Sequence, residues 1–200
     1  MLTHTPQQNS VFPQPGSEAA SQCGASGFDV VMLTTAHSAT DDRIFGREAQ
    51  TLAEAGLSVC ILGLHPRSES SGGVRLEALP SPRNRLQRFL RGWEVLRRAR
   101  RLGGRLYVFH DPELFGVGLI LRLLGKRVVY DCHENVPMQV LQKFWIPTPL
   151  RFLLVPLVSV AEWLCSRFLT GVITVNETLE KRFPRGRTVL RAKIFAILTI

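Results

Sequence analysis

The segment Gly125–Glu134, GKRVVYDCHE, is a short apolar run that ends at a histidine flanked by acidic residues. A second apolar run ends in the same way at His110-Asp111-Pro112-Glu113. In open α/β sheets, ligands bind outside the carboxyl ends of the parallel strands. The two segments therefore predict one site that is formed by two strand ends.

Strand-like and helix-like segments alternate from Phe28 onward. The expected strands are FDVVMLT from Phe28, then Leu57–Leu64, Val74–Leu79, Arg105–Phe109, Lys126–Tyr130, Gly171–Val175 and Arg187–Leu190. The near-continuous apolar character of Leu57–Leu64 is typical of a parallel strand that is covered on both faces. This alternation predicts an α/β fold with a doubly wound, mostly parallel, Rossmann-like sheet.

Helices are expected between these strands, with one polar loop at residues 66–73. They are expected at Arg43–Ala55, Arg85–Leu102, Pro112–Leu124, within Val136–Leu169 as one or two proline-interrupted helices, and from Asn176 to Phe183. The helix Arg85–Leu102 should bury one apolar stripe, because its large apolar residues follow helical spacing. These residues are Leu86, Phe89, Leu90, Trp93 and Leu96.

The length of 200 residues suits one ordinary domain with a tail. Residues 1–26, rich in Gln, Ser, Pro, Gly and Ala, predict a disordered tail. Residues 27–191 form the expected domain. Residues 192–200 do not continue the pattern, which indicates a truncated end; a final buried strand is the alternative.

Basic residues outnumber acidic ones, 25 to 16, which gives a net charge of +9. Nine arginines fall between Arg83 and Arg105, where Glu94 is the single acid. Such a cluster attracts phosphates in nucleic acid, anionic lipid or a substrate. The alternative interpretation is that these arginines form a solvated helix face. No helix-turn-helix, aromatic platform or zinc finger accompanies it, so nucleic acid is not expected as a partner.

The most hydrophobic region, Phe144–Val175, is interrupted by prolines and by charged residues such as Arg151 and Glu162. A transmembrane span is therefore not expected. No secretion signal is recognisable, and the widely spaced cysteines suit a reducing cytoplasm. We expect a cytoplasmic location, with this region and the arginine-rich helix as a peripheral surface for the inner face of an anionic membrane.

Several common chemistries lack their motifs in this sequence. There is no G-x-G-x-x-G for a nicotinamide or flavin, no G-x-x-x-x-G-K-[ST] for a nucleoside triphosphate, and no G-x-S-x-G for a serine hydrolase. The four cysteines have no metal-ligand spacing, so no metal is expected. Among enzymes, a transferase is the class that remains.

His133 is the candidate catalytic residue, because a histidine at a strand end can bind a hydroxyl or carry a proton near neutral pH. Asp131 and Glu134 flank it and could orient the imidazole or hold a sugar hydroxyl. The alternative is that His133 bonds a loop carbonyl. Asp111 and Glu113 have their own alternative roles, as a helix N-cap and as a charge at the helix dipole.

Four blocks, in order, resemble the N-terminal half of a family 4 (group 1) glycosyltransferase. They are TTAHSATDDRIFGREAQTLAEAGLSV from Thr34, VFHDPEL from Val108, RVVYDCHE from Arg127 and VITVNE from Val172, and the likeness spans about Phe28 to Leu190. The resemblance implies a GT-B fold, in which the N-terminal Rossmann-like domain holds mainly the acceptor and the C-terminal one the nucleotide sugar.

The resemblance also assigns roles to residues of this chain. His133 matches the family's histidine beside the reacting sugar. Glu134, next to His133, is assigned to the acceptor side. His110, Asp111 and Glu113 match the family's polar segment after the fourth strand. Asp42 and Arg43 match the loop that closes over the acceptor.

The implied activity is retaining, metal-independent transfer from a nucleotide-diphosphate sugar, without a further cofactor, to a glycan or lipid-linked acceptor in bacterial surface polysaccharide synthesis. The first loop lacks the family's Gly-Gly pair, and no C-terminal donor motif occurs before Ile200. We therefore expect the chain to be incomplete alone and to need a donor domain in trans, which leaves open whether it is itself an enzyme. A non-catalytic remnant or binding module, and a sugar-nucleotide epimerase of related fold, remain as alternatives.

Overall fold

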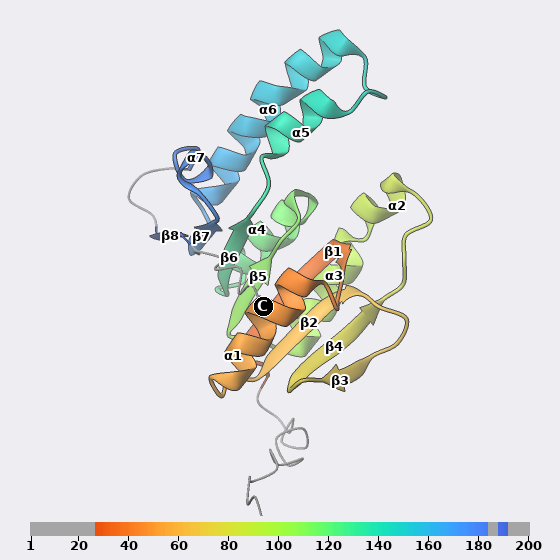
Figure 1. Ribbon diagram of the computed structural model, residues 1–200, viewed down its shortest axis with the longest axis vertical. Helices are drawn as coiled ribbons and strands as arrows, with labels where there is room; N and C mark the ends of the chain where they lie inside the picture. The colour runs from red at the N-terminus through yellow and green to blue at the C-terminus, as the bar shows by residue number, and fades with distance from the viewer. Residues whose placement is uncertain (1–26, 184–187, 192–200) are drawn as a thin grey trace, which may run out of the picture.

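A computed structural model describes residues 27–183 and 188–191 of the chain (Figure 1). The expected tail at 1–26 and the expected truncated end at 192–200 lie outside the described residues. The expected domain at 27–191 is described except for residues 184–187.

The strands in the described part of the chain form one eight-stranded sheet in the order β3-β4-β2-β1-β5-β6-β7-β8. They are β1 (Val30–Ser38), β2 (Val59–Leu64), β3 (Glu69–Ser71), β4 (Val74–Leu79), β5 (Leu106–Phe109), β6 (Arg127–Cys132), β7 (Gly171–Thr174) and β8 (Thr188–Arg191). All neighbours are parallel except β3 and β4. The predicted mostly parallel sheet is confirmed, and β1 lies between β2 and β5, where the winding reverses.

Helices cover both faces of this sheet. They are η2 (Asp42–Ala49), α1 (Gln50–Glu54), α2 (Arg85–Leu90), α3 (Gly92–Leu102), η3 (Pro112–Leu114), α4 (Phe115–Leu123), α5 (Val136–Gln142), α6 (Thr148–Ser166) and α7 (Glu177–Glu180). Alternate residues of β1 join different cores: Val31 packs in one with Leu96 of α3, and Val30 in the other with Ile44 of η2. The doubly wound architecture follows from this alternation.

The helix expected at Arg85–Leu102 is divided into α2 and α3 at Arg91. The Arg91 side chain is buried, and its guanidinium donates to the carbonyls of Pro80 and Ser81. The predicted apolar stripe is wrong: Leu86, Leu90 and Trp93 are 67–70% exposed, whereas Leu96 is buried beside Val95 and Ala99. The buried stripe is therefore confined to α3, and the described apolar side chains of α2 face away from the core.

β3 occupies part of the segment that the sequence predicts as a loop. It pairs antiparallel with β4 through a turn at Gly72 and Gly73, whose φ angles are 52° and 77°. These left-handed angles favour glycine and permit a tight hairpin. The composition of Glu69–Ser71 gives no apolar strand pattern because the strand lies at the sheet edge.

α5 and α6 form a hairpin that extends beyond the sheet (Figure 1). α6 runs for 19 residues and continues through Pro156, and most of its side chains are exposed. Within the described residues, the stretch Thr148–Phe168 has a mean hydropathy of 1.4 and is long and apolar enough to cross a membrane by length and composition. By itself, a single helix that passes this test is weak evidence for a span, so the expectation that no segment crosses a membrane stays a prediction.

Candidate functional site

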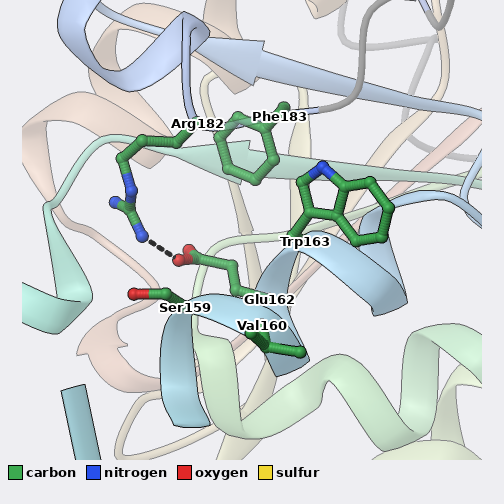
Figure 2. A pocket seen from close by; sticks show the side chains of 6 residues that line it. All are labelled: Ser159, Val160, Glu162, Trp163, Arg182 and Phe183. Atoms are coloured by element: carbon green, nitrogen blue, oxygen red, sulfur yellow. Dashed lines mark hydrogen bonds and ion pairs between the residues drawn. The ribbon is translucent and has the colours of Figure 1, made fainter. Parts of the chain in front are cut away.

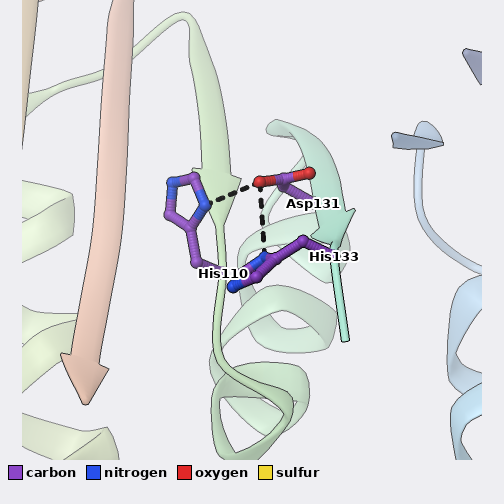
Figure 3. A group of neighbouring side chains, drawn as sticks. All are labelled: His110, Asp131 and His133. Carbon is purple, nitrogen blue, oxygen red and sulfur yellow. Dashed lines mark hydrogen bonds and ion pairs between the residues drawn. The ribbon is translucent and has the colours of Figure 1, made fainter. Parts of the chain in front are cut away.

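The site lies where the carboxyl ends of β1, β5 and β6 meet, beside the reversal of winding. β5 and β6 pair in register from Leu106 and Arg127 to Phe109 and Tyr130. His110 follows β5 directly, Asp131 lies near the end of β6, and His133 follows β6 (Figure 3). The parallel pairing of the two strands therefore brings the two strand ends together.

His110, Asp131 and His133 form a compact cluster (Figure 3). Nδ1 of His110 lies 2.9 Å from Oδ2 of Asp131, and Nδ1 of His133 lies 3.7 Å from the same oxygen. The two ring centroids are 6.4 Å apart. The side chains of His110 and Asp131 are fully buried, while that of His133 remains 16% exposed. His133 is thus the member of the cluster that a ligand can reach from solvent.

Arg43 joins the cluster from the first loop. Its guanidinium pairs with Oδ2 of Asp131, and its Nε donates to Oε1 of Glu48 at 3.0 Å. Asp41 places the start of η2, because its Oδ1 accepts from the backbone N–H of Arg43 and Ile44 at 3.0 and 3.2 Å. The loop after β1 is thereby fixed to the end of β6.

The surroundings of the cluster shift the pKa of its members in ways that suit a neutral imidazole beside a carboxylate. Burial lowers the pKa of His133, and the positive charge of Arg43 lowers it further. Burial raises the pKa of Asp131, but the hydrogen bond and charge of His110 and the charge of Arg43 outweigh it and lower the pKa overall. Burial, followed by the charge of Asp131, raises the pKa of Glu48. The directions of these shifts favour the ionised form of Asp131 and the neutral form of His133.

The carboxylate of Asp111 binds the end of β1. Its Oδ2 accepts from Oγ1 of Thr34 at 2.8 Å and from the backbone N–H of Thr35 at 2.6 Å. Asp111 occupies the N-cap position of η3, as its alternative role expects, but its side chain makes no cap hydrogen bond there. Its short side chain instead satisfies donors where β1 and β5 separate.

The remaining candidate residues lie at different distances from this network. Oε1 of Glu113 accepts from Oγ1 of Thr35 at 3.1 Å, beside Asp111. Glu134 is exposed and accepts from Gln139 at 2.5 Å. The side chain of Asp42 is 89% exposed and pairs with Arg47 at 3.5 Å. The structure thus brings together His133, His110, Asp111, Glu113 and Arg43, whereas Glu134 and Asp42 contact groups outside the cluster; their roles in binding stay predictions.

His37 was not among the sequence candidates. Its ring centroid lies 5.6 Å from that of His133, and its Nε2 lies 3.6 Å from Oδ1 of Asp111. Its position near the end of β1 was the available signal, because β1 supplies a third strand end. Asp131 was considered only as a neighbour of His133, although a spacing of two residues places both on one face of an extended segment.

The cluster also contains a possible ligand set for a metal ion. One ligand atom from each of His110, Asp131 and His133 lies within 4.8 Å of the others, and Oδ1 of Asp131 and Nε2 of His110 have no hydrogen-bond partner. However, the Arg43 guanidinium already pairs with Asp131 and would repel a cation there. The charge arrangement therefore favours an uncharged or anionic ligand over a metal.

A second polar group surrounds a pocket of 310 Å³ beside α6 (Figure 2). Glu162 is buried, accepts from the Tyr130 hydroxyl at 3.1 Å and pairs with Arg182. Burial raises the pKa of Glu162, and burial followed by the charge of Glu162 raises that of Cys132 to about 12. Sequence analysis did not connect these residues, because Glu162 was interpreted only as a charge that interrupts an apolar run. The pocket is lined by Ser159, Val160, Glu162, Trp163, Arg182 and Phe183.

A sequence profile of the family described as "Glycosyl transferase 4-like domain" matches residues 17–197. The chain belongs to this glycosyltransferase family. No curated protein matches the sequence of this family 4-like domain. Among solved structures, a sucrose-phosphate synthase from Thermosynechococcus elongatus is similar, with a TM-score of 0.54 and 16% identity over 83% of this chain and 90% of that chain. The comparison supports the Rossmann-like fold of a GT-B glycosyltransferase domain.

Proposed function

We propose that this family 4-like domain binds the acceptor during transfer of a sugar from a nucleotide-diphosphate sugar. The acceptor is a glycan or a lipid-linked sugar of bacterial surface polysaccharide synthesis. The reaction retains the configuration of the sugar and uses no metal. A donor-binding half, in the same protein or in a partner, completes the site in this proposal.

The partly exposed imidazole of His133 at the end of β6 is the observation that carries the proposal. Its Nδ1 is buried 3.7 Å from Asp131, so its accessible edge is the one available to a ligand. A neutral imidazole can accept a hydrogen bond from a sugar hydroxyl or donate one to its oxygen. Family membership supports a sugar as the ligand, and the position at the reversal of winding supports a binding site there.

In the proposed reaction, the bond between the anomeric carbon and the diphosphate breaks while the acceptor oxygen forms a new bond to that carbon. The acceptor hydroxyl passes its proton to an oxygen of the departing diphosphate. His133 holds one of the reacting sugar hydroxyls in place, which reduces the entropic part of the barrier. Asp131 and Arg43 hold the imidazole environment rigid through the buried network.

The test is a transfer assay with the chain, a supplied C-terminal donor-binding half and a panel of nucleotide sugars and acceptors. His133→Ala should lower turnover about a hundredfold or more, as expected for loss of a positioned proton-transfer or orienting group. His65→Gln is the control, because His65 pairs with Glu69 on β3 instead of joining the cluster. Its turnover should equal that of the wild type.

Unchanged turnover in the His133→Ala variant would refute the catalytic assignment. Product formed from the nucleotide sugar without any acceptor would instead identify an epimerase. Absence of transfer with every donor and acceptor, with or without the supplied half, would favour a binding module.

A further inference from the structure

The α5–α6 hairpin extends from the carboxyl-end side of the sheet (Figure 1), and many of its large apolar side chains are exposed. The connection between the helices exposes 87% of Phe144 and 60% of Trp145. Further exposed apolar side chains follow along α6: Leu150, Phe152, Leu153, Leu157, Val160 and Leu164. An exposed patch of this kind on a folded domain indicates a surface that contacts an apolar partner.

Arg151 organises the tip of this hairpin. Its Nε donates to the carbonyl of Ile146 at 2.6 Å, and its two terminal nitrogens donate to Leu141 at 3.3 Å and Phe144 at 3.0 Å. Its guanidinium also lies 5.7 Å from the centroid of the Phe144 ring. The backbone of the tip and the Phe144 ring are therefore held in place by Arg151.

The charges of the hairpin are of one sign. Between Asn135 and Ala161 the sequence contains Lys143 and Arg151 and no acidic residue. The next acid, Glu162, is buried and pairs with Arg182. A surface with exposed aromatic residues, basic charge and no acid complements an anionic lipid headgroup layer. A second copy of the same hairpin would instead place like charges opposite each other.

We propose that the tip of the α5–α6 hairpin inserts into the interfacial layer of a bilayer that contains anionic lipid. Trp and Phe side chains favour this layer. The hairpin docks on the bilayer and does not cross it, because Glu162 and Ser166 in the last turns of α6 are buried against the protein. Glu162 additionally bonds to Tyr130 of β6. The proposal does not depend on sugar transfer.

The arginine-rich segment keeps much of its charge at the surface. Arg91 is buried, whereas Arg97, Arg100 and Arg101 stay exposed. The side chain of Arg105 is 82% exposed. These charges add attraction to an anionic bilayer, while the apolar side chains at the hairpin tip supply the part that inserts.

The experiment is flotation of the 200-residue chain with phosphatidylcholine vesicles that do or do not contain phosphatidylglycerol. The wild type should float with the anionic vesicles, and more weakly with the neutral ones. F144S/W145S should lower the partition coefficient for anionic vesicles about tenfold or more, because two large apolar groups no longer leave water. Circular dichroism checks that F144S/W145S, and the control variant described below, are folded.

The matched control is L123S/L124S. Leu123 and Leu124 are 87% and 47% exposed. They lie at the end of α4, just before β6 begins, and therefore near the amino ends of the strands, whereas the hairpin follows the carboxyl end of β6. This control should float like the wild type.

Three outcomes would overturn the proposal. They are no flotation of the wild type with anionic vesicles, equal flotation of F144S/W145S and wild type, and equal loss of flotation in the control variant. Equal binding to neutral and anionic vesicles would refute the choice of anionic lipid. Self-association that F144S/W145S abolishes, without vesicle binding, would assign the surface to a second copy.

Discussion

Two buried carboxylates lie on opposite sides of β6 and behave differently. Asp131 belongs to the strand and meets Arg43 and His110, and its pKa is lowered. Glu162 comes from α6, meets Arg182 and the hydroxyl of Tyr130, and has a raised pKa. Each carboxylate has one arginine, so the arginine does not explain the difference.

The difference comes from the other neighbours. His110 donates a hydrogen bond to Asp131 and contributes positive charge when protonated, which favours the carboxylate form. The hydrogen bonds from Tyr130 and Cys132 lower the pKa of Glu162, as does Arg182, but desolvation by burial outweighs them and raises it overall. The first group therefore keeps a charged network next to an accessible imidazole, whereas the second fastens α6 to the sheet.

The largest expected effect is on stability after Arg43→Met. This change leaves a fully buried Asp131 without its guanidinium, which should lower the free energy of unfolding by about 3 kcal/mol. Urea unfolding followed by circular dichroism measures it. Arg47→Met is the control on the same helix, since its partner Asp42 is 89% exposed, and it should change stability by less than about 0.5 kcal/mol. Equal effects of the two variants would show that Arg43 does not stabilise the fold through the buried Asp131.

A smaller effect distinguishes the two carboxylates by the pH dependence of stability. The lowered pKa of Asp131 means that its ionised form stabilises the fold above its ordinary value of 3.8 and that this contribution is lost as pH falls below that value. Asp131→Asn should therefore cost about 2 kcal/mol at neutral pH and less in acid.

Glu162→Gln should show the opposite trend. The raised pKa means that wild-type stability decreases as pH rises above 4.5 towards the folded-state value, and the variant lacks this loss. Its cost, about 1 kcal/mol in acid, should therefore shrink as pH rises. Urea unfolding of the three proteins at several pH values measures both trends, and parallel trends would refute the contrast between the two groups.

The smallest expected effect is on the titration of His133, observed by NMR of its imidazole. The pKa should lie below 6.5 in the wild type. Arg43→Met should raise it, because a nearby positive charge is removed, while Asp131→Asn should lower it further, because a negative charge is removed. Arg47→Met should leave it unchanged. Shifts of the opposite sign would show that the charges do not act on His133 as the geometry implies.

The sheet was predictable because its inner strands are buried on both faces and read as apolar runs. The ends of β5 and β6 could also be located, because each run stops at histidine and acidic residues. His110 and His133 thus came from the sequence. The partnership of Asp131 with Arg43 did not, because it joins residues that are 88 positions apart.

Other features depend on contacts that local patterns do not encode. The break at Arg91 depends on the carbonyls of Pro80 and Ser81, which accept from its guanidinium. β3 forms because β4 offers an edge, since Glu69–Ser71 has little strand pattern of its own. The apolar residues of α6 correctly predicted a helix, but their periodicity could not show that most of them are exposed instead of packed against the protein.

A short connection between β6 and α5 joins the hairpin directly to the candidate site. Only Glu134 and Asn135 separate His133 from the first residue of α5. The side chain of Asn135 accepts from the backbone N–H of Met138 at 3.4 Å, as a cap of α5. The imidazole is therefore anchored at the base of the hairpin, and whatever holds the tip also tethers the residues that surround His133.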